Sequence, residues 1–228
     1  EAWCASRGDL PWDAAKAALD APLAASPASL EIAFTGGEPF LADDLLRRCV
    51  AYARETARPG TRLAFSASSN GLLLDEERAR FLAASDFDLQ VSWDGEAQEE
   101  RAPGTSSAVK ERIARLAAAA PEWFRRRVRV ACTLTPSNLA LLPASVETFL
   151  ESGLRTILVH PAWGLEWPPA AELERALDGV LAEVARTCAP LVRDGEPAPV
   201  AILRPPPPRE WDDDSLCPCD AASPFSFA

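Results

Sequence analysis

Residues 34–41 have the sequence FTGGEPFL and directly follow an apolar run at residues 30–34, which predicts a β-strand. The turn after this strand consists of Gly36, Gly37, Glu38 and Pro39. The glycines allow a sharp bend and a close approach of a ligand to the main chain, the glutamate supplies an acceptor, and the proline suits the start of a helix. The stretch therefore predicts either a plain strand-to-helix turn or a loop that holds an ammonium group.

Short β-rich runs alternate with helical patterns along the rest of the chain, which is typical of βαβ units around a parallel sheet. The predicted strands cover residues 30–34, 62–66, 88–93, 128–134 and 156–160, with a further strand at 200–203. The predicted helices cover residues 11–25, 41–57, 75–84, 106–119, 137–152 and 170–189. We therefore expect an α/β barrel with its ligand site at the carboxyl ends of the strands. Because the first clear element is a helix, the first strand of the barrel is expected to be missing before Glu1.

Composition limits the class of protein and its partners. The 228 residues are 48% hydrophobic and 25% charged, which is typical of a folded chain. A net charge of -11 argues against nucleic acid as a partner, because a phosphate backbone needs a basic surface. No apolar run approaches the roughly 18–20 residues of a membrane span, and no signal segment opens the chain. We expect a cytoplasmic protein that binds a small molecule or a peptide, and neither nucleic acid nor a membrane.

The chain is expected to hold one barrel domain, residues 1–204, and a tail, residues 205–228. The tail begins with the proline run Pro205–Pro208, which predicts an extended linker. The chain contains no methionine, so we expect that it starts partway into its gene product. The six cysteines show no framework spacing, which indicates reduced thiols rather than disulfides.

Three further motifs follow the turn at residues 36–39 in order. Residues 69–76 read SNGLLLDE, residues 92–95 read SWDG, and residues 133–138 read TLTPSN. Together with the Gly-Gly-Glu-Pro turn, they resemble motifs of the radical S-adenosylmethionine enzymes. The resemblance is strongest to the branch of anaerobic sulfatase-maturating and peptide-modifying enzymes, which often carries a cysteine-rich SPASM extension.

This resemblance implies a partial (β/α)6 TIM-like barrel that holds a [4Fe-4S] cluster and S-adenosylmethionine (AdoMet). Reductive cleavage of AdoMet, with electrons from an external donor, would give a 5'-deoxyadenosyl radical that abstracts hydrogen from a substrate. The branch implies that this substrate is a peptide. The implied cofactor-binding residues are Gly36, Gly37, Glu38, Pro39, Ser69, Asn70, Ser92, Asp94 and Arg101. Of these, Glu38 would meet the methionine amine, Arg101 the carboxylate and Ser92, beside Asp94, the ribose. Turn formation or a solvated helix end is the alternative for each.

The family's Cys-x3-Cys-x2-Cys cluster loop is absent from Glu1 to Ala228. Either the loop lies upstream of Glu1, or the barrel has lost its cluster. Cys4 is the one candidate ligand near the expected position, and Cys217 and Cys219 are candidates for an auxiliary cluster in the extension, or else free thiols. Without the loop, we expect the polypeptide as it stands to be inactive.

Two alternative functions follow from the same residues. A cluster-free barrel would serve as a peptide- or nucleotide-binding module. A metal-independent lyase or aldolase is disfavoured because no lysine ends a strand to form a Schiff base. His160, the only histidine, ends a predicted strand and is either a packed residue or a catalyst. Trp163 and Trp167 follow it and either line a substrate entrance or cover the barrel end.

Overall fold

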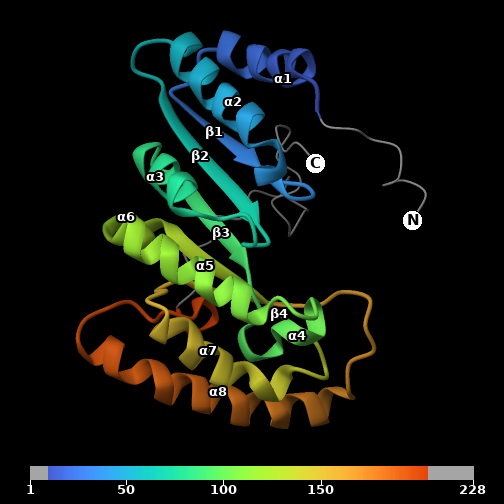
Figure 1. Ribbon diagram of the computed structural model, residues 1–228. Coiled ribbons are helices and arrows are strands. Elements are labelled where there is room, and N and C mark those ends of the chain that lie inside the picture. The colour runs from blue at the N-terminus through green and yellow to red at the C-terminus, as the bar shows by residue number, and fades with distance from the viewer. Residues whose placement is uncertain (1–9, 205–228) are drawn as a thin grey trace. The chain divides into compact units, whose positions relative to one another are not determined.

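The computed structural model describes residues 10–204, which fall into two compact units, residues 10–68 and residues 69–204. Figure 1 shows both units. Each unit combines helices with parallel strands, so the predicted α/β class is confirmed. No helix between residues 10 and 204 is both long enough and apolar enough to cross a membrane.

The first unit is built from two helix–strand pairs. In chain order these are α1 (Trp12–Ala24), β1 (Ser29–Phe34), α2 (Asp43–Thr56) and β2 (Arg62–Ser69), with a 3-10 turn at Pro39–Ala42 before α2. The strands run parallel, from the pair Ser29 and Arg62 to the pair Phe34 and Ala67. Figure 1 shows α1 and α2 lying together over the strands. This arrangement is the βαβ unit that the alternating pattern predicts.

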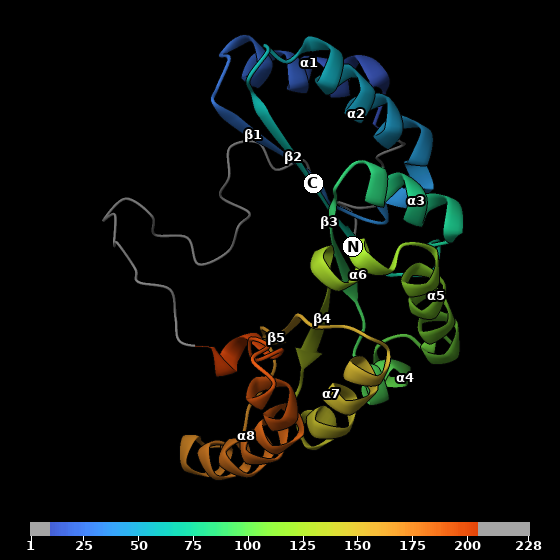
Figure 2. The same ribbon diagram turned by 90° about the vertical axis from the view of Figure 1, so that its left-hand side faces the viewer.

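The second unit contains three parallel strands and most of the helices. Its strands are β3 (Asp88–Ser92), β4 (Val128–Leu134) and β5 (Ile157–Pro161), with β4 paired to both of the others. Its helices are α3 (Glu76–Ala84), α4 (Gln98–Arg101), α5 (Ser106–Ala119), α6 (Pro121–Arg127), α7 (Leu142–Glu151) and α8 (Ala170–Arg193). Figure 2 shows α8 lying along α7. Only Val184 and Cys188 of α8 are fully buried, so α8 is the outermost layer.

Burial alternates along β3, and along β4 every second residue is buried, with Ala131 buried as well. Leu89 and Val91 of β3 pair with Val128 and Val130 of β4, and all four are buried. The residues between them, including Gln90 and Ser92 on β3, are half-buried. Register partners point to the same face of a sheet, so one face is the apolar core and the other presents polar side chains.

Most predicted elements are confirmed, one predicted strand is wrong, and the helices α4 and α6 were not predicted. The strand predicted at residues 200–203 is a single bridge between Val200 and Ile157 followed by a 3-10 turn at Ala201–Leu203. Prolines flank this segment and cannot donate to a ladder. No helix was expected at residues 121–127, yet α6 begins at Pro121, because proline is well tolerated at the first helical position.

Candidate functional site

The turn after β1 keeps an open backbone. Gly36 has a φ of +113°, in the region that favours glycine, and both Gly36 and Gly37 are exposed. A Cβ placed on Gly37 would find no atom within 4 Å. The Glu38 side chain accepts a hydrogen bond from the Phe40 backbone N–H at 3.3 Å, which caps the following 3-10 turn. Nothing in the packing of the described residues therefore requires glycine at position 37.

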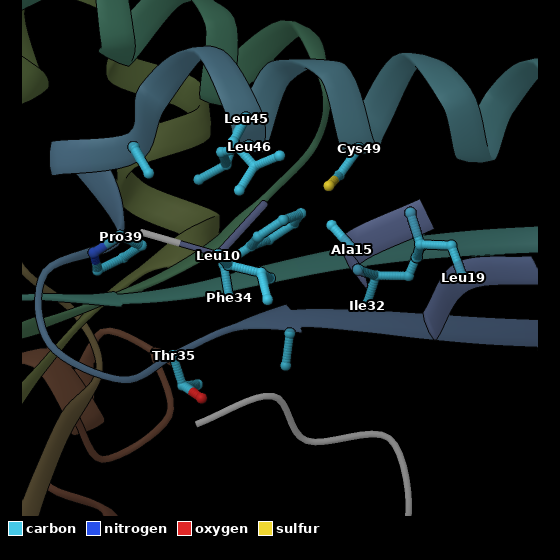
Figure 3. A pocket seen from close by; sticks show the side chains of 12 residues that line it. Leu10, Ala15, Leu19, Ile32, Phe34, Thr35, Pro39, Leu45, Leu46 and Cys49 are labelled. Carbon is cyan, nitrogen blue, oxygen red and sulfur yellow. The ribbon is translucent and has the colours of Figure 1, made fainter. Parts of the chain in front are cut away.

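A cavity of about 150 Å³ lies in the same unit, between the two helices and β1 (Figure 3). It is lined mainly by apolar side chains, among them Leu10, Leu19, Ile32, Phe34, Leu45 and Leu46. Figure 3 shows the Cys49 sulfur pointing towards it from α2. Burial raises the pKa of Cys49, so this thiol stays neutral. Among the residues that the structure describes, the lining offers van der Waals contact but no charged group for a polar cofactor.

The exit from β2 forms local turns. The Ser69 hydroxyl is buried and accepts a hydrogen bond from the Gly71 N–H at 3.0 Å. The exposed Asn70 accepts one from the Leu72 N–H at 2.9 Å through its side-chain oxygen. These are the Asx and serine turns that the sequence offered as the alternative to ligand contact. Their role towards a cofactor stays a prediction.

The exit from β3 carries a buried acid paired with an exposed base. The Asp94 side chain is 4% exposed, and that of Arg101 is 38% exposed. Arg101 Nη1 lies 3.2 Å from Asp94 Oδ1 and 3.4 Å from the hydroxyl of Thr133, at the end of β4. The Thr133 backbone N–H also donates to Asp94 Oδ1, at 2.7 Å. Asp94 thus ties the end of β4 to the helix that carries Arg101.

The loop that holds Asp94 is fixed from two sides. The Asp94 N–H donates to the Gln98 side-chain oxygen at 3.0 Å, and the Asp94 carbonyl accepts from the Ser145 hydroxyl at 3.1 Å. Ser145 Oγ also accepts from the Glu96 N–H, at 3.0 Å. Sequence reasoning missed both Gln98 and Ser145. The four-residue spacing of Gln98 from Asp94 gives a local signal, whereas Ser145 lies on α7, far along the chain.

The described cysteines lie in three different elements and are buried: Cys49 in α2, Cys132 in β4 and Cys188 in α8. Burial, and then the nearby Asp94 carboxylate, raise the pKa of Cys132 to about 12. Between residues 10 and 204 no group of three or more His, Cys, Asp or Glu side chains has the arrangement of a metal site. Cys4, Cys217 and Cys219 lie outside the described residues.

His160 occupies the polar face of the second unit. It is the register partner of Thr133, so the two side chains share one face of the sheet, and His160 is exposed. In the loop that follows, Trp163 is 90% exposed, and Trp167 donates its indole N–H to the Ala162 carbonyl at 3.3 Å. The carboxyl end of β5 and the loop after it therefore present the His160 imidazole and the Trp163 ring to solvent.

The predicted site residues are divided between the units: residues 36–39 lie in the first, and Ser69, Asn70, Ser92, Asp94 and Arg101 lie in the second. The structure brings Asp94 and Arg101 into direct contact and adds Thr133 to them. Except for Arg101, which ends the short helix α4, each of these residues stands at or just after the carboxyl end of its own strand. In parallel α/β proteins this is the edge where ligands bind.

No family model matches the chain, and no curated protein matches it. Solved structures do match. They include anSMEcpe, an anaerobic sulfatase-maturating enzyme, with AdoMet and the Kp18Cys peptide bound, at a TM-score of 0.69 and 17% identity over 85% of this chain and 56% of that one. They also include His-tagged anSMEcpe with AdoMet, at a TM-score of 0.70 and 17% identity over 88% of this chain and 57% of that one.

A third structure, anSMEcpe with AdoMet and the Cp18Cys peptide, gives a TM-score of 0.69 and 17% identity over 86% of this chain. The chain spans little more than half the length of these structures, 56–57%. At this identity the likeness is one of backbone arrangement. Over most of its length, the chain therefore shares the fold of anSMEcpe.

Proposed function

We propose that the chain is the core of a radical AdoMet enzyme that binds AdoMet in a partial (β/α)6 barrel and acts on a peptide. The observation that carries the proposal is the shared fold with AdoMet-bound anSMEcpe over 85–88% of this chain. The Gly-Gly-Glu-Pro turn at the carboxyl end of β1 adds to it, because it stands at the end of a strand where parallel α/β proteins bind ligands. The peptide is proposed because anSMEcpe structures hold one.

In this proposal the residues of the chain hold AdoMet by its methionine part. The turn at residues 36–39 receives the amino group, with Gly37 leaving open space beside the backbone. Arg101 receives the carboxylate, because a guanidinium matches a carboxylate with two parallel hydrogen bonds. Ser92, half-buried at the end of β3, is assigned to the ribose. When bound and reduced by an external electron donor, AdoMet supplies a 5'-deoxyadenosyl radical that takes a hydrogen atom from the substrate.

The iron cluster does not fit residues 10–204. A [4Fe-4S] cluster that leaves one iron open needs three thiolates close together. The described cysteines are separated into α2, β4 and α8, and burial raises the pKa of each, which favours the neutral thiol. We therefore propose that the cluster ligands lie outside residues 10–204.

The test is reductive cleavage of AdoMet by the complete natural protein, loaded anaerobically with iron and sulfide. The expected results are an electron paramagnetic signal after reduction and formation of 5'-deoxyadenosine. Gly37→Val is expected to weaken AdoMet binding by roughly tenfold or more, because the added side chain fills the open space. Gly179→Val is the matched control, since Gly179 in α8 also has no neighbour within 4 Å of an added Cβ.

Each outcome separates the proposal from its alternatives. Cleavage by the wild type together with a selective loss in Gly37→Val supports the assignment of the turn. Binding of AdoMet or peptide with neither a cluster nor 5'-deoxyadenosine would instead indicate a cluster-free binding module. Equal losses of AdoMet binding in Gly37→Val and Gly179→Val would show that the turn at residues 36–39 does not contact AdoMet.

A further inference from the structure

The Asp94 carboxylate is enclosed by protein donors rather than open to a ligand. The sequence places Asp94 beside Ser92 in the loop assigned to the ribose. In the structure only 4% of its side chain is exposed. Its Oδ1 accepts from the Thr133 N–H at 2.7 Å and from Arg101 Nη1 at 3.2 Å, and its Oδ2 lies 3.4 Å from the same Nη1. Because the side chain is buried and both oxygens already face donors of the protein, a hydroxyl of a cofactor has little access to it.

The backbone around Asp94 is held as firmly as the side chain. Its N–H and its carbonyl are bonded to Gln98 and Ser145. Gln98 is itself buried and donates to the Thr105 hydroxyl at 3.0 Å, at the start of α5. A carboxylate fixed in this way presents a constant acceptor to the long, flexible side chain of Arg101.

Arg101 is held at one end of its guanidinium only. Within residues 10–204, its side-chain hydrogen bonds all involve Nη1, which meets Asp94 and Thr133. The Nε and Nη2 donors are on the other edges of the planar group, and the side chain is 38% exposed. A guanidinium anchored through one nitrogen keeps a pair of donors for a second carboxylate in a fixed plane.

We propose that Asp94 is a positioning residue that orients Arg101 for the carboxylate of the AdoMet methionine, and that it does not itself touch the cofactor. This inference rests on the proposed binding of AdoMet. Two effects of Asp94 oppose each other: its negative charge weakens the attraction of Arg101 for another carboxylate, and its hydrogen bonds fix the guanidinium plane. Orientation is the stronger effect here, because the pair is partly desolvated and the Asp94 loop is fixed on both sides.

A double-mutant cycle on the complete natural protein tests the inference by calorimetric titration with S-adenosylhomocysteine. This probe keeps the carboxylate but cannot yield the radical, so the readout is affinity and not turnover. Arg101→Ala is expected to weaken binding roughly 10- to 100-fold, as for loss of a charge-assisted hydrogen bond. Asp94→Ala is expected to weaken it roughly tenfold, and Asp94→Asn by less, because the amide oxygen can still accept.

The double variant decides between positioning and direct contact. If Asp94 acts through Arg101, adding Asp94→Ala to Arg101→Ala costs no further affinity. Asp88→Ala is the matched control: Asp88 begins β3, the strand that precedes Asp94, and pairs with Arg127 at 3.4 Å, and its loss is expected to change affinity less than twofold. Should Asp94→Ala fail to fold, Asp94→Asn in the wild-type and Arg101→Ala backgrounds gives the same comparison.

The failures are distinguishable. Losses that multiply in the double variant would show direct contact of Asp94 with the ligand and overturn the inference alone. Tighter binding by Asp94→Ala would show that charge outweighs orientation, which also overturns it. Absence of binding by the wild type would overturn the proposed function, and the inference with it.

Discussion

The turns after β1 and after β3 both leave the end of a parallel strand and both contain a glycine with positive φ, +113° at Gly36 and +60° at Gly95. Their surroundings differ. Gly36 and Gly37 are exposed, and an added Cβ on Gly37 would meet nothing within 4 Å. Gly95 is buried, and an added Cβ would stand 2.6 Å from that of Ser145. Packing explains the glycine in the second turn, whereas no described neighbour requires glycine at position 37, where the proposed function places a ligand.

Replacement of Gly95 by alanine is expected to have the largest effect and tests whether the second turn is tightly packed. The new Cβ would overlap Ser145 and would force a left-handed backbone on alanine, so unfolding free energy should fall by about 2–5 kcal/mol. Gly37→Ala, the control, should change it by about 0.5 kcal/mol or less. Urea unfolding followed by circular dichroism measures both. Similar losses in the two variants would refute the distinction between a packed turn and an open one.

The reactivity of two cysteine thiols, Cys49 in the first unit and Cys132 in the second, extends this comparison. Cys132 lies in β4 near Asp94, where burial and that carboxylate raise its pKa to about 12, whereas Cys49 lines the cavity of the first unit. At pH 8 the thiolate fraction of Cys132 should be on the order of 1000-fold lower than that of an ordinary thiol. Single-cysteine variants treated with a disulfide reagent should react faster at Cys49 than at Cys132. Rapid native-state labelling of Cys132 would contradict the packing described here.

The smallest expected effect concerns Glu99, in the helix after the second turn. Its carboxylate accepts from the backbone N–H groups of Gly104, at 2.6 Å, and Ser106, at 3.0 Å. These bonds lower the pKa of Glu99 in the folded state. The stability that they contribute is therefore present above the unfolded pKa and is lost as pH falls through the folded pKa. Glu99→Gln should be slightly less stable than the wild type at neutral pH and equal to it at the acid end; a constant difference across that range would contradict the assignment.

The strands and most of the helices could be predicted from the sequence because their signals are local. Buried residues at every second position from Val128 to Leu134 mark β4, and Asp75 caps α3 by accepting from the Arg78 N–H at 2.9 Å. The segment at residues 200–203 was mispredicted because its composition suits a strand, while the flanking prolines limit pairing to one bridge. Local composition does not reveal how many backbone hydrogen bonds a segment can form with the adjacent strand.

The contacts among the candidate site residues could not be predicted from the sequence. The motifs pointed to Asp94 and Arg101 separately, the first in the loop expected at the ribose and the second for a carboxylate. The structure pairs them and buries the first, because Thr133 on β4 and Ser145 on α7 reach the same loop from positions 39 and 51 residues along the chain. Long-range hydrogen bonds of this kind leave no local pattern in a single sequence.

The most direct test of the proposed function is a crystal structure of the complete natural protein with S-adenosylhomocysteine. The proposal predicts the carboxylate of the ligand at about 2.7–2.9 Å from the Arg101 guanidinium and its amino group beside Gly36–Glu38, with Asp94 still bonded to Arg101. A ligand bound elsewhere, with Arg101 and Gly37 both in contact only with solvent, would contradict it.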